Sequence, residues 1–134
     1  MTDGPLVIDT SALLAVLFVE DDAQTYAQAL QSAAALRMAA PTWVESMQVA
    51  TARRGRIGQE GLQELLVRLD VEVVACDAGL ARLAYEAWLR FGKGRHPAGL
   101  NFGDCFSYAL AKQRGEPLLF KGDDFSRTDL TAAR

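Results

Sequence analysis

Four short motifs place acidic side chains where chemistry could be built. They contain Asp9, Glu45, Asp104 and the doublet Asp123 and Asp124. Each acid lies where a short apolar segment ends or where a predicted helix begins. Carboxylates from several such junctions can converge on one point, and converging carboxylates without a basic partner need a cation. That combination is typical of metal-dependent phosphodiester cleavage.

The acids must be positioned by the strands and helices that flank them. Hydrophobic patterning predicts strands at residues 6–8, 37–40, 71–75 and 118–120, and helices at residues 11–18, 22–35, 43–53, 59–69, 78–90 and 104–114. Strands that alternate with helices indicate a parallel sheet covered on both faces. Ligands of such sheets bind beyond the carboxyl ends of the strands. We therefore expect the acidic motifs to face one edge of the sheet, within one domain over residues 1–134.

Length, composition and charge favour a small globular protein. Half of the 134 residues are hydrophobic, and the net charge of -3 argues against general coating of nucleic acid while allowing a local basic face. Cys76 and Cys105 form no C-x-x-C pair and are typical of buried thiols in a reducing compartment. No apolar run reaches about 18 residues, and no signal-peptide pattern is present. We therefore expect a cytoplasmic protein with no membrane partner.

Every one of these acids also has a purely structural interpretation. The structural alternatives are capping boxes at Thr42 with Glu45 and at Asn101 with Asp104, a helix start at Asp9, and a turn at Asp123 and Asp124. An acid near a helix N-terminus gains roughly 0.3–1 kcal/mol from the helix dipole. Taken singly, each acid is explained about equally well in either way. The joint pattern, with every acid at the same kind of junction, favours a shared site.

The donor set predicts the metal. Mg²⁺ binds through one or two carboxylates and keeps several waters, and Mn²⁺ accepts the same oxygen ligands. A single histidine and two distant cysteines offer no zinc spacing. Asp9 and Asp104 are the predicted metal ligands. Glu45, with its longer side chain, is a predicted base or a holder of a metal-bound water, and the choice between Asp123 and Asp124 stays open.

Hydroxyl and aromatic side chains near the acids are candidates for substrate contact. The hydroxyls that could orient water or phosphate belong to Thr10, Ser11 and Ser107, although local hydrogen bonds explain them about twice as well. The aromatic rings that could stack on RNA bases belong to Trp43, Phe91 and Phe102. Core positions are favoured for all three rings.

Basic side chains form three groups that could hold phosphates. They are Lys93, Arg95 and His96 before the third acid, Arg53, Arg54 and Arg56 in the middle of the chain, and Lys121 beside the last acidic motif. A solvated surface explains each group about equally well.

With these residues in place, the sequence resembles the PIN-domain ribonucleases, and most of all the VapC-type toxins of bacterial toxin–antitoxin pairs. The stretches that carry the resemblance are VIDTSAL at residues 7–13, Glu45 on the helix after the second strand, GLNFGDCFSYALAK at residues 99–112, and LLFKGDDF at residues 118–125. The third stretch is the most specific. No motif acid is missing, and the doublet is the one departure because it leaves the fourth acid ambiguous.

The resemblance implies both a fold and an activity. It implies a three-layer α/β/α sandwich with a central, mainly parallel sheet, and an Mg²⁺- or Mn²⁺-dependent endoribonuclease that cleaves tRNA or another structured RNA. It also implies a homodimer and inhibition by a VapB-like antitoxin that inserts a segment near the acidic site. Contact with DNA would then be indirect, through the antitoxin.

Three other functions compete with this hypothesis. A haloacid-dehalogenase-like phosphatase needs a second aspartate two residues after the first, where this chain has Ser11. A receiver domain, which is a signalling module, would use a lysine such as Lys121 but expects an acidic pair where Asp9 is followed by Thr10. A PIN fold that only binds a partner is the third, and the intact acids argue against it.

Overall fold

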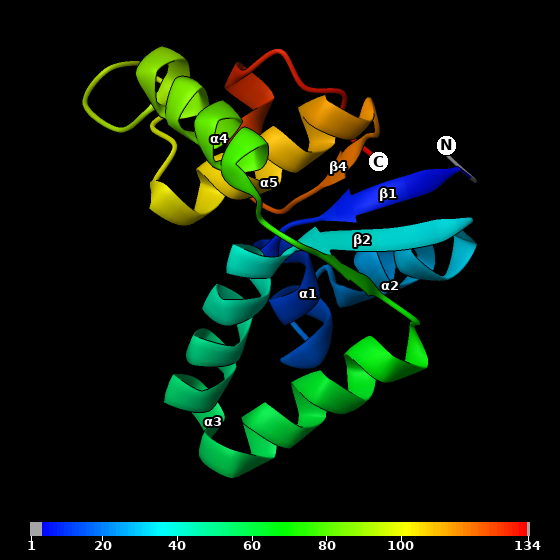
Figure 1. Ribbon diagram of the computed structural model, residues 1–134. Helices are drawn as coiled ribbons and strands as arrows, with labels where there is room; N and C mark the ends of the chain where they lie inside the picture. Colours follow the sequence, from blue (N-terminus) through cyan, green and yellow to red (C-terminus); the bar gives the residue numbers. More distant parts are fainter. Residues whose placement is uncertain (1–3, 134) are drawn as a thin grey trace.

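A four-stranded parallel sheet forms the centre of the molecule (Figure 1). The computed structural model describes residues 4–133. The strands are β1 (Pro5–Ile8), β2 (Ala35–Ala39), β3 (Glu72–Val74) and β4 (Leu118–Leu119). Their order in the sheet is β3-β2-β1-β4, and all three pairings are parallel. The prediction of a parallel sheet between helical layers is confirmed.

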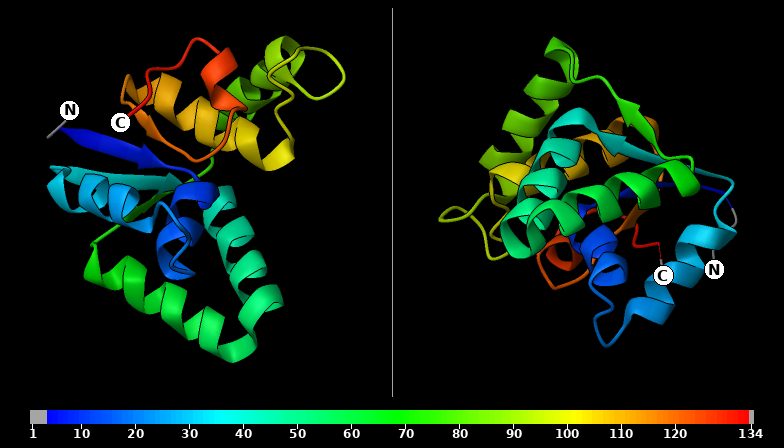
Figure 2. Two further views of the ribbon diagram at one scale, coloured as in Figure 1. Left: turned by 180° about the vertical axis from the view of Figure 1, so that it is seen from behind. Right: turned by 90° about the horizontal axis from the view of Figure 1, so that it is seen from below.

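Helices cover both faces of this sheet (Figures 1 and 2). They are α1 (Thr10–Leu17), α2 (Ala23–Ser32), α3 (Ala40–Arg68), α4 (Ala78–Phe91), α5 (Phe102–Arg114) and the short 3-10 helix η1 (Phe125–Arg127). One face packs against α1, α2 and α3, and the other against α4 and α5. Alternation along β1 divides the core, since Leu6 and Ile8 enter the first layer and Val7 enters the second. Within residues 4–133, no helix is both long and apolar enough to cross a membrane.

The long helix α3 has two arms that meet at Gly55. The sequence predicts two separate helices here, but the helical range is continuous apart from Gly55, whose φ of 57° and ψ of -139° turn the chain. Glycine adopts this left-handed conformation without a Cβ clash. Figure 1 shows the two arms meeting at an angle. The second arm returns Leu62 and Leu66 to the core.

The strand register brings the acidic motifs to one edge. Ile8 of β1 pairs with Leu119 of β4, so Asp9 and Lys121 emerge from the same end of neighbouring strands. At that end, β2 continues directly into α3. The expectation that the motifs face the carboxyl edge therefore follows from the pairing.

Candidate active site

Asp9 ends β1 and caps α1. Its Oδ2 accepts hydrogen bonds from the backbone N–H of Ser11 at 3.1 Å and from the Ser11 hydroxyl at 2.7 Å. Its Oδ1 accepts a hydrogen bond from the Ser107 hydroxyl of α5 at 2.7 Å. The carboxylate is thus held by three donors from two helices. Because an ionised carboxylate offers about four acceptor positions, one remains for a further ligand.

Glu45 projects from the second turn of α3 towards α1. Its Oε1 accepts a hydrogen bond from Thr10 Oγ1 at 2.7 Å. Its Oε2 lies against Gly103, where an added Cβ would stand 2.2 Å away. Burial raises the pKa of Glu45, the Thr10 bond opposes this, and the charge of Asp9 raises the pKa further. Glu45 is half-buried, and its burial and the charge of Asp9 together outweigh the Thr10 bond, so that its ionised form is disfavoured.

The capping box predicted for Thr42 and Glu45 is wrong. The helix begins two residues before Thr42, with Ala39 as its N-cap and no side-chain capping bond. Glu45 lies too far into the helix to reach the cap, and Thr10 binds its carboxylate instead. The Glu45 carboxylate therefore has no capping role in α3.

Asp104 sits in the first turn of α5 in the capping box that the sequence predicts. Its backbone N–H donates to Asn101 Oδ1 at 2.9 Å, and its Oδ2 accepts from the Asn101 backbone N–H at 3.0 Å. Burial raises the pKa of Asp104 to about 7, the Asn101 bond opposes this, and the charges of Asp9, Asp124 and Glu45 add to it. The acid is therefore a capping residue and also part of a mutually repelling cluster.

The last acidic motif contributes Asp124 to this cluster. Asp124 is the member of the doublet whose charge raises the pKa of Asp104. Asp123 instead uses its backbone carbonyl to accept hydrogen bonds from the N–H and hydroxyl of Ser126. Both side chains are exposed. The geometry favours Asp124 as the fourth acid, which remains a prediction.

Hydroxyl side chains surround the first two acids. Ser11 and Ser107 donate to Asp9, and Thr10 donates to Glu45. These are the three hydroxyls singled out in the sequence, and in this structure they orient carboxylates. Sequence reasoning missed Ser46 and treated Thr42 only as a cap, yet both are fully buried beside the site. Their spacing of four residues on the helix that carries Glu45 is the signal that points to them.

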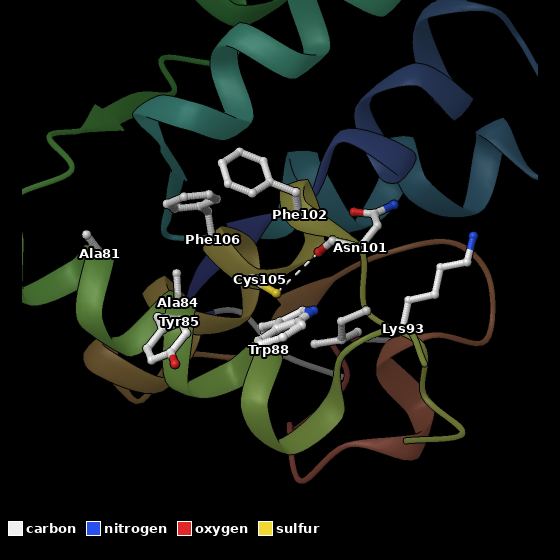
Figure 3. Close-up of a pocket in the computed structure, with 10 residues that line it drawn as sticks. Ala81, Ala84, Tyr85, Trp88, Lys93, Asn101, Phe102, Cys105 and Phe106 are labelled. Carbon is white, nitrogen blue, oxygen red and sulfur yellow. Dashed lines mark hydrogen bonds between the residues drawn. The ribbon is translucent and has the colours of Figure 1, made fainter. Parts of the chain in front are cut away.

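Two hollows meet beside the acids. A cleft of about 750 Å³ is lined by Glu45 and Gly103, and a groove of about 470 Å³ between α4 and α5 is lined by Tyr85 and Trp88. Both hollows share Phe102 and Phe106. Figure 3 shows these two rings on α5, with the groove residues of α4 facing the same helix. The groove between α4 and α5 therefore lies directly next to the cleft that Glu45 lines.

The prediction of core positions holds for one of the three aromatic side chains and is wrong for two. Phe91 is buried in the core, as predicted. Core positions are wrong for Phe102, which is 80% exposed, and for Trp43, which is 36% exposed. Phe102 contacts Phe106 edge to face, with ring centroids 5.0 Å apart. It is the first residue of α5 and borders both hollows.

The match to a known domain family covers almost the entire chain. A family model described as PIN domain matches residues 6–130. The chain belongs to the PIN-domain family. It is 48% identical over 127 residues to ribonuclease VapC of Mycolicibacterium smegmatis, covering 95% of this chain and 98% of that protein. It is 47% identical over 125 residues to ribonuclease VapC30 of Mycobacterium tuberculosis, covering 93% and 95%.

Solved structures show the same fold at low sequence identity. The Mycobacterium tuberculosis toxin VapC20, which cleaves the sarcin–ricin loop, superposes with a TM-score of 0.78 at 19% identity, covering 94% of this chain and 96% of that one. A chain of VapBC2 from Rickettsia felis, solved on a promoter DNA fragment, superposes with a TM-score of 0.74 at 12% identity, covering 96% of each. The identities to curated relatives place the chain among the VapC-type PIN domains.

Most basic side chains near this PIN-domain site already have partners. The Lys121 ammonium binds Glu20 and Asp22, which leaves its backbone N–H to donate to the Ser11 hydroxyl at 2.9 Å. Arg53 pairs with Glu20 at 3.8 Å. These contacts give Lys121 a role in fixing the loop after β4.

The basic loop before α5 is also partly engaged. Arg95 donates to the Leu89 carbonyl at 3.1 Å and lies 4.9 Å above the Trp88 ring. His96 Nδ1 accepts from the Ala98 backbone N–H at 3.0 Å. Lys93 is exposed and lines the groove, where Figure 3 shows its side chain extending along the rim. Of this loop, Lys93 is the side chain best placed to meet a phosphate.

The acidic cluster has the donor set of a hard divalent ion. In the part of the chain that the structure describes, no three His, Cys, Asp or Glu side chains are arranged as a metal site as they stand. Mg²⁺ needs only one or two carboxylates, with water for the rest. The charges that act on Asp104 come from carboxylates, and every one of them raises its pKa. A cation beside Asp9 and Asp104 would remove that repulsion, so the residues fit such an ion.

Proposed function

We propose that this chain is a divalent-metal-dependent endoribonuclease of the VapC type. The observation that carries the proposal is the cluster of Asp9, Glu45, Asp104 and Asp124 next to the sheet edge, where burial and then the charges of the other three acids raise the pKa of Asp104 to about 7. The curated relatives named as VapC ribonucleases support the activity. Structured RNA such as tRNA is the proposed substrate, as the family resemblance implies.

The residues divide the work of cleavage. Asp9 and Asp104 would hold Mg²⁺ or Mn²⁺, each with a carboxylate that already accepts hydrogen bonds from its own donors. When bound, the ion would supply an activated water and stabilise the charge that develops on the phosphate. Glu45 keeps Oε2 clear of the Thr10 bond and towards the cleft. From there it would accept a proton or hold a water, and Lys93 would meet a flanking phosphate.

RNA cleavage by purified protein tests this proposal. We expect cleavage of a structured RNA with Mg²⁺ or Mn²⁺ and none in excess EDTA. Asp9→Asn and Asp104→Asn should each reduce the rate on the order of a thousandfold, equivalent to about 4 kcal/mol of transition-state stabilisation. Asp21→Asn is the matched control, since Asp21 is exposed on the loop between α1 and α2. Full activity in EDTA would refute the metal mechanism.

We further propose that the groove between α4 and α5 receives an apolar helix of a VapB-like antitoxin. Its lining is almost entirely apolar, with Ala81, Ala84 and Trp88 on one side and Phe106 on the other. Amphipathic helices lay their apolar faces into grooves of this kind. A bound helix would end beside Glu45 because Phe102 borders both hollows. Contact with DNA would come through the antitoxin, and a homodimer of this chain is part of the same proposal.

An exposed small residue in the groove offers a clean test. Ala81 lines the groove and is exposed, so Ala81→Arg should block the helix without disturbing the core. We expect it to weaken capture of the antitoxin at least tenfold while RNA cleavage persists, and Ala81→Ser should behave as the unaltered protein. Equal binding by both variants would place the antitoxin elsewhere. Sedimentation of the isolated chain tests the homodimer.

A further inference from the structure

Every hydroxyl that donates to a carboxylate of the site also accepts a hydrogen bond from a second donor. For Ser11 the second donor is the backbone N–H of Lys121 at 2.9 Å. For Ser107 and Thr10 the neighbours are side-chain hydroxyls of α3, Thr42 and Ser46. A hydroxyl has one proton and can accept from others. The direction of each of these bonds is therefore set by where that single proton goes.

In the hydrogen bonds that end at Asp9, the first donor belongs to α3. Ser107 gives its proton to Asp9 Oδ1 at 2.7 Å. Its bond to Thr42 Oγ1, at 3.3 Å, must therefore be one that it accepts. Thr42 is the donor, and its side chain is fully buried. The order is Thr42 to Ser107 to Asp9.

The bonds that lead to Glu45 follow the same rule. Thr10 gives its proton to Glu45 Oε1 at 2.7 Å, so it accepts from Ser46 Oγ at 2.9 Å. The Thr42 carbonyl lies 3.5 Å from Thr10 Oγ1, at the limit of a hydrogen bond. Ser46 is fully buried as well. The order is Ser46 to Thr10 to Glu45.

We propose that Thr42 and Ser46 are positioning residues, which fix the proton direction of Ser107 and Thr10 and thereby hold Asp9 and Glu45 in the geometry that binds a divalent ion. Among the described residues, the hydroxyls of Thr42 and Ser46 bond other hydroxyls and not a carboxylate. They stand four residues apart on the first arm of α3, so one helix face serves two acids that come from different elements. This inference rests on the proposed metal-dependent function.

These outer donors matter because a hydroxyl can rotate and point its proton at more than one acceptor. Without its outer donor, Ser107 or Thr10 keeps an unsatisfied acceptor on a buried side chain, and the cost of that acceptor weakens the arrangement around the acid. Groups that hydrogen-bond to metal-ligating side chains commonly change metal affinity by 10–100-fold when they are removed. Thr42 and Ser46 act one bond further out. We therefore expect a smaller change, of about fivefold, for the loss of one such hydrogen bond.

Mn²⁺ binding, followed by electron paramagnetic resonance of the free ion, tests the proposal without any need for catalysis. Thr42→Val removes the hydroxyl and keeps the shape, and Thr42→Ser keeps the hydroxyl and removes a methyl group. We expect Thr42→Val to bind Mn²⁺ about fivefold more weakly and Thr42→Ser to stay within about twofold of the unaltered chain. Ser46→Ala, which adds no bulk, should weaken binding by a similar factor. Melting in EDTA confirms that each variant is folded.

The outcomes separate this proposal from the one on which it rests. Unaltered Mn²⁺ affinity in both Thr42→Val and Ser46→Ala would overturn the positioning role. Equal weakening in Thr42→Val and Thr42→Ser would also overturn it, because the effect would then come from packing. If the unaltered chain bound no Mn²⁺, the proposed metal site would fail and the inference with it.

Discussion

The four acids form two halves that are held in different ways. The hydroxyl-bonded half contains Asp9 and Glu45, whose carboxylates accept bonds from side-chain hydroxyls. The second half is called the loop half after Asp124, which lies on an exposed loop. It also contains Asp104 of α5, whose carboxylate accepts one hydrogen bond from a backbone donor in its capping box. The first half is fixed by directional bonds, and the second contains Asp104, whose pKa burial and neighbouring charges raise to about 7. Geometry in one half and charge in the other should therefore respond to different perturbations.

Among changes that leave all four acids in place, the largest effect is expected where the two halves touch. A Cβ added at Gly103 of α5 would stand 2.2 Å from Glu45 Oε2, so Gly103→Ala must displace the carboxylate from Thr10. Because a misplacement of 1 Å can cost about a hundredfold in rate, we expect RNA cleavage to fall by about that factor. Single-turnover cleavage measures it.

Gly79→Ala is the matched control for this change, because its added Cβ would make only an ordinary contact at 3.4 Å. Both variants should melt close to the unaltered chain. A Gly103→Ala variant with an unchanged rate would show that the position of Glu45 does not limit cleavage.

An intermediate effect is expected within the loop half. Asp124→Asn removes a charge that raises the pKa of Asp104. Asp123→Asn changes only the side chain of a residue whose backbone carbonyl accepts the hydrogen bond from Ser126. We expect Asp124→Asn to slow cleavage by about tenfold, equivalent to about 1.4 kcal/mol, and Asp123→Asn to stay within about twofold. Initial rates at several Mg²⁺ concentrations measure both. The reverse order would assign Asp123 as the fourth acid.

Sequence reasoning succeeded where local signals and strand order suffice. Apolar runs and their alternation with helices predict the parallel sheet, and strand direction alone then brings Asp9 to the edge where α5 begins. The capping box at Asn101 and Asp104 is also local, because both partners lie within one turn. These features depend on neighbours in the chain, so a single sequence reveals them.

The same reasoning failed where the role of a residue depends on a partner that is distant in the sequence. The spacing of Thr42 and Glu45 suits a cap, but α3 starts earlier and Thr10, from another helix, binds Glu45. The hydrogen bond between Ser107 and Asp9 joins residues 98 positions apart. Phe102 is exposed at the start of α5, beside two hollows that other elements help to form. No local pattern contains this information, since each contact exists only after the layers have packed.

The smallest effect should appear as a pH dependence of stability that differs between the halves. In the metal-free fold the pKa of Asp104 is raised from 3.8 to about 7, chiefly by burial. An acid whose pKa is raised by folding binds more protons folded than unfolded, so its contribution to stability is complete below about pH 4 and is lost as pH rises through about 7. In EDTA, we expect the melting temperature to fall by roughly 5 °C between pH 5 and pH 8.

Two variants separate charge from geometry in that experiment. Asp104→Asn should remove most of the slope and melt above the unaltered chain at pH 8, because the amide oxygen still accepts from the Asn101 N–H and no charge is buried. Glu45, whose pKa is also raised, would leave a residual slope of the same sign. Asp9→Asn should instead melt lower at every pH, because an amide nitrogen cannot accept the bond that Ser11 or Ser107 donates. Excess Mg²⁺ should flatten the slope of the unaltered chain, since a cation favours the ionised acids. If Asp104→Asn and Asp9→Asn shifted the melting temperature alike, the two halves would not differ in the way that their hydrogen bonds indicate.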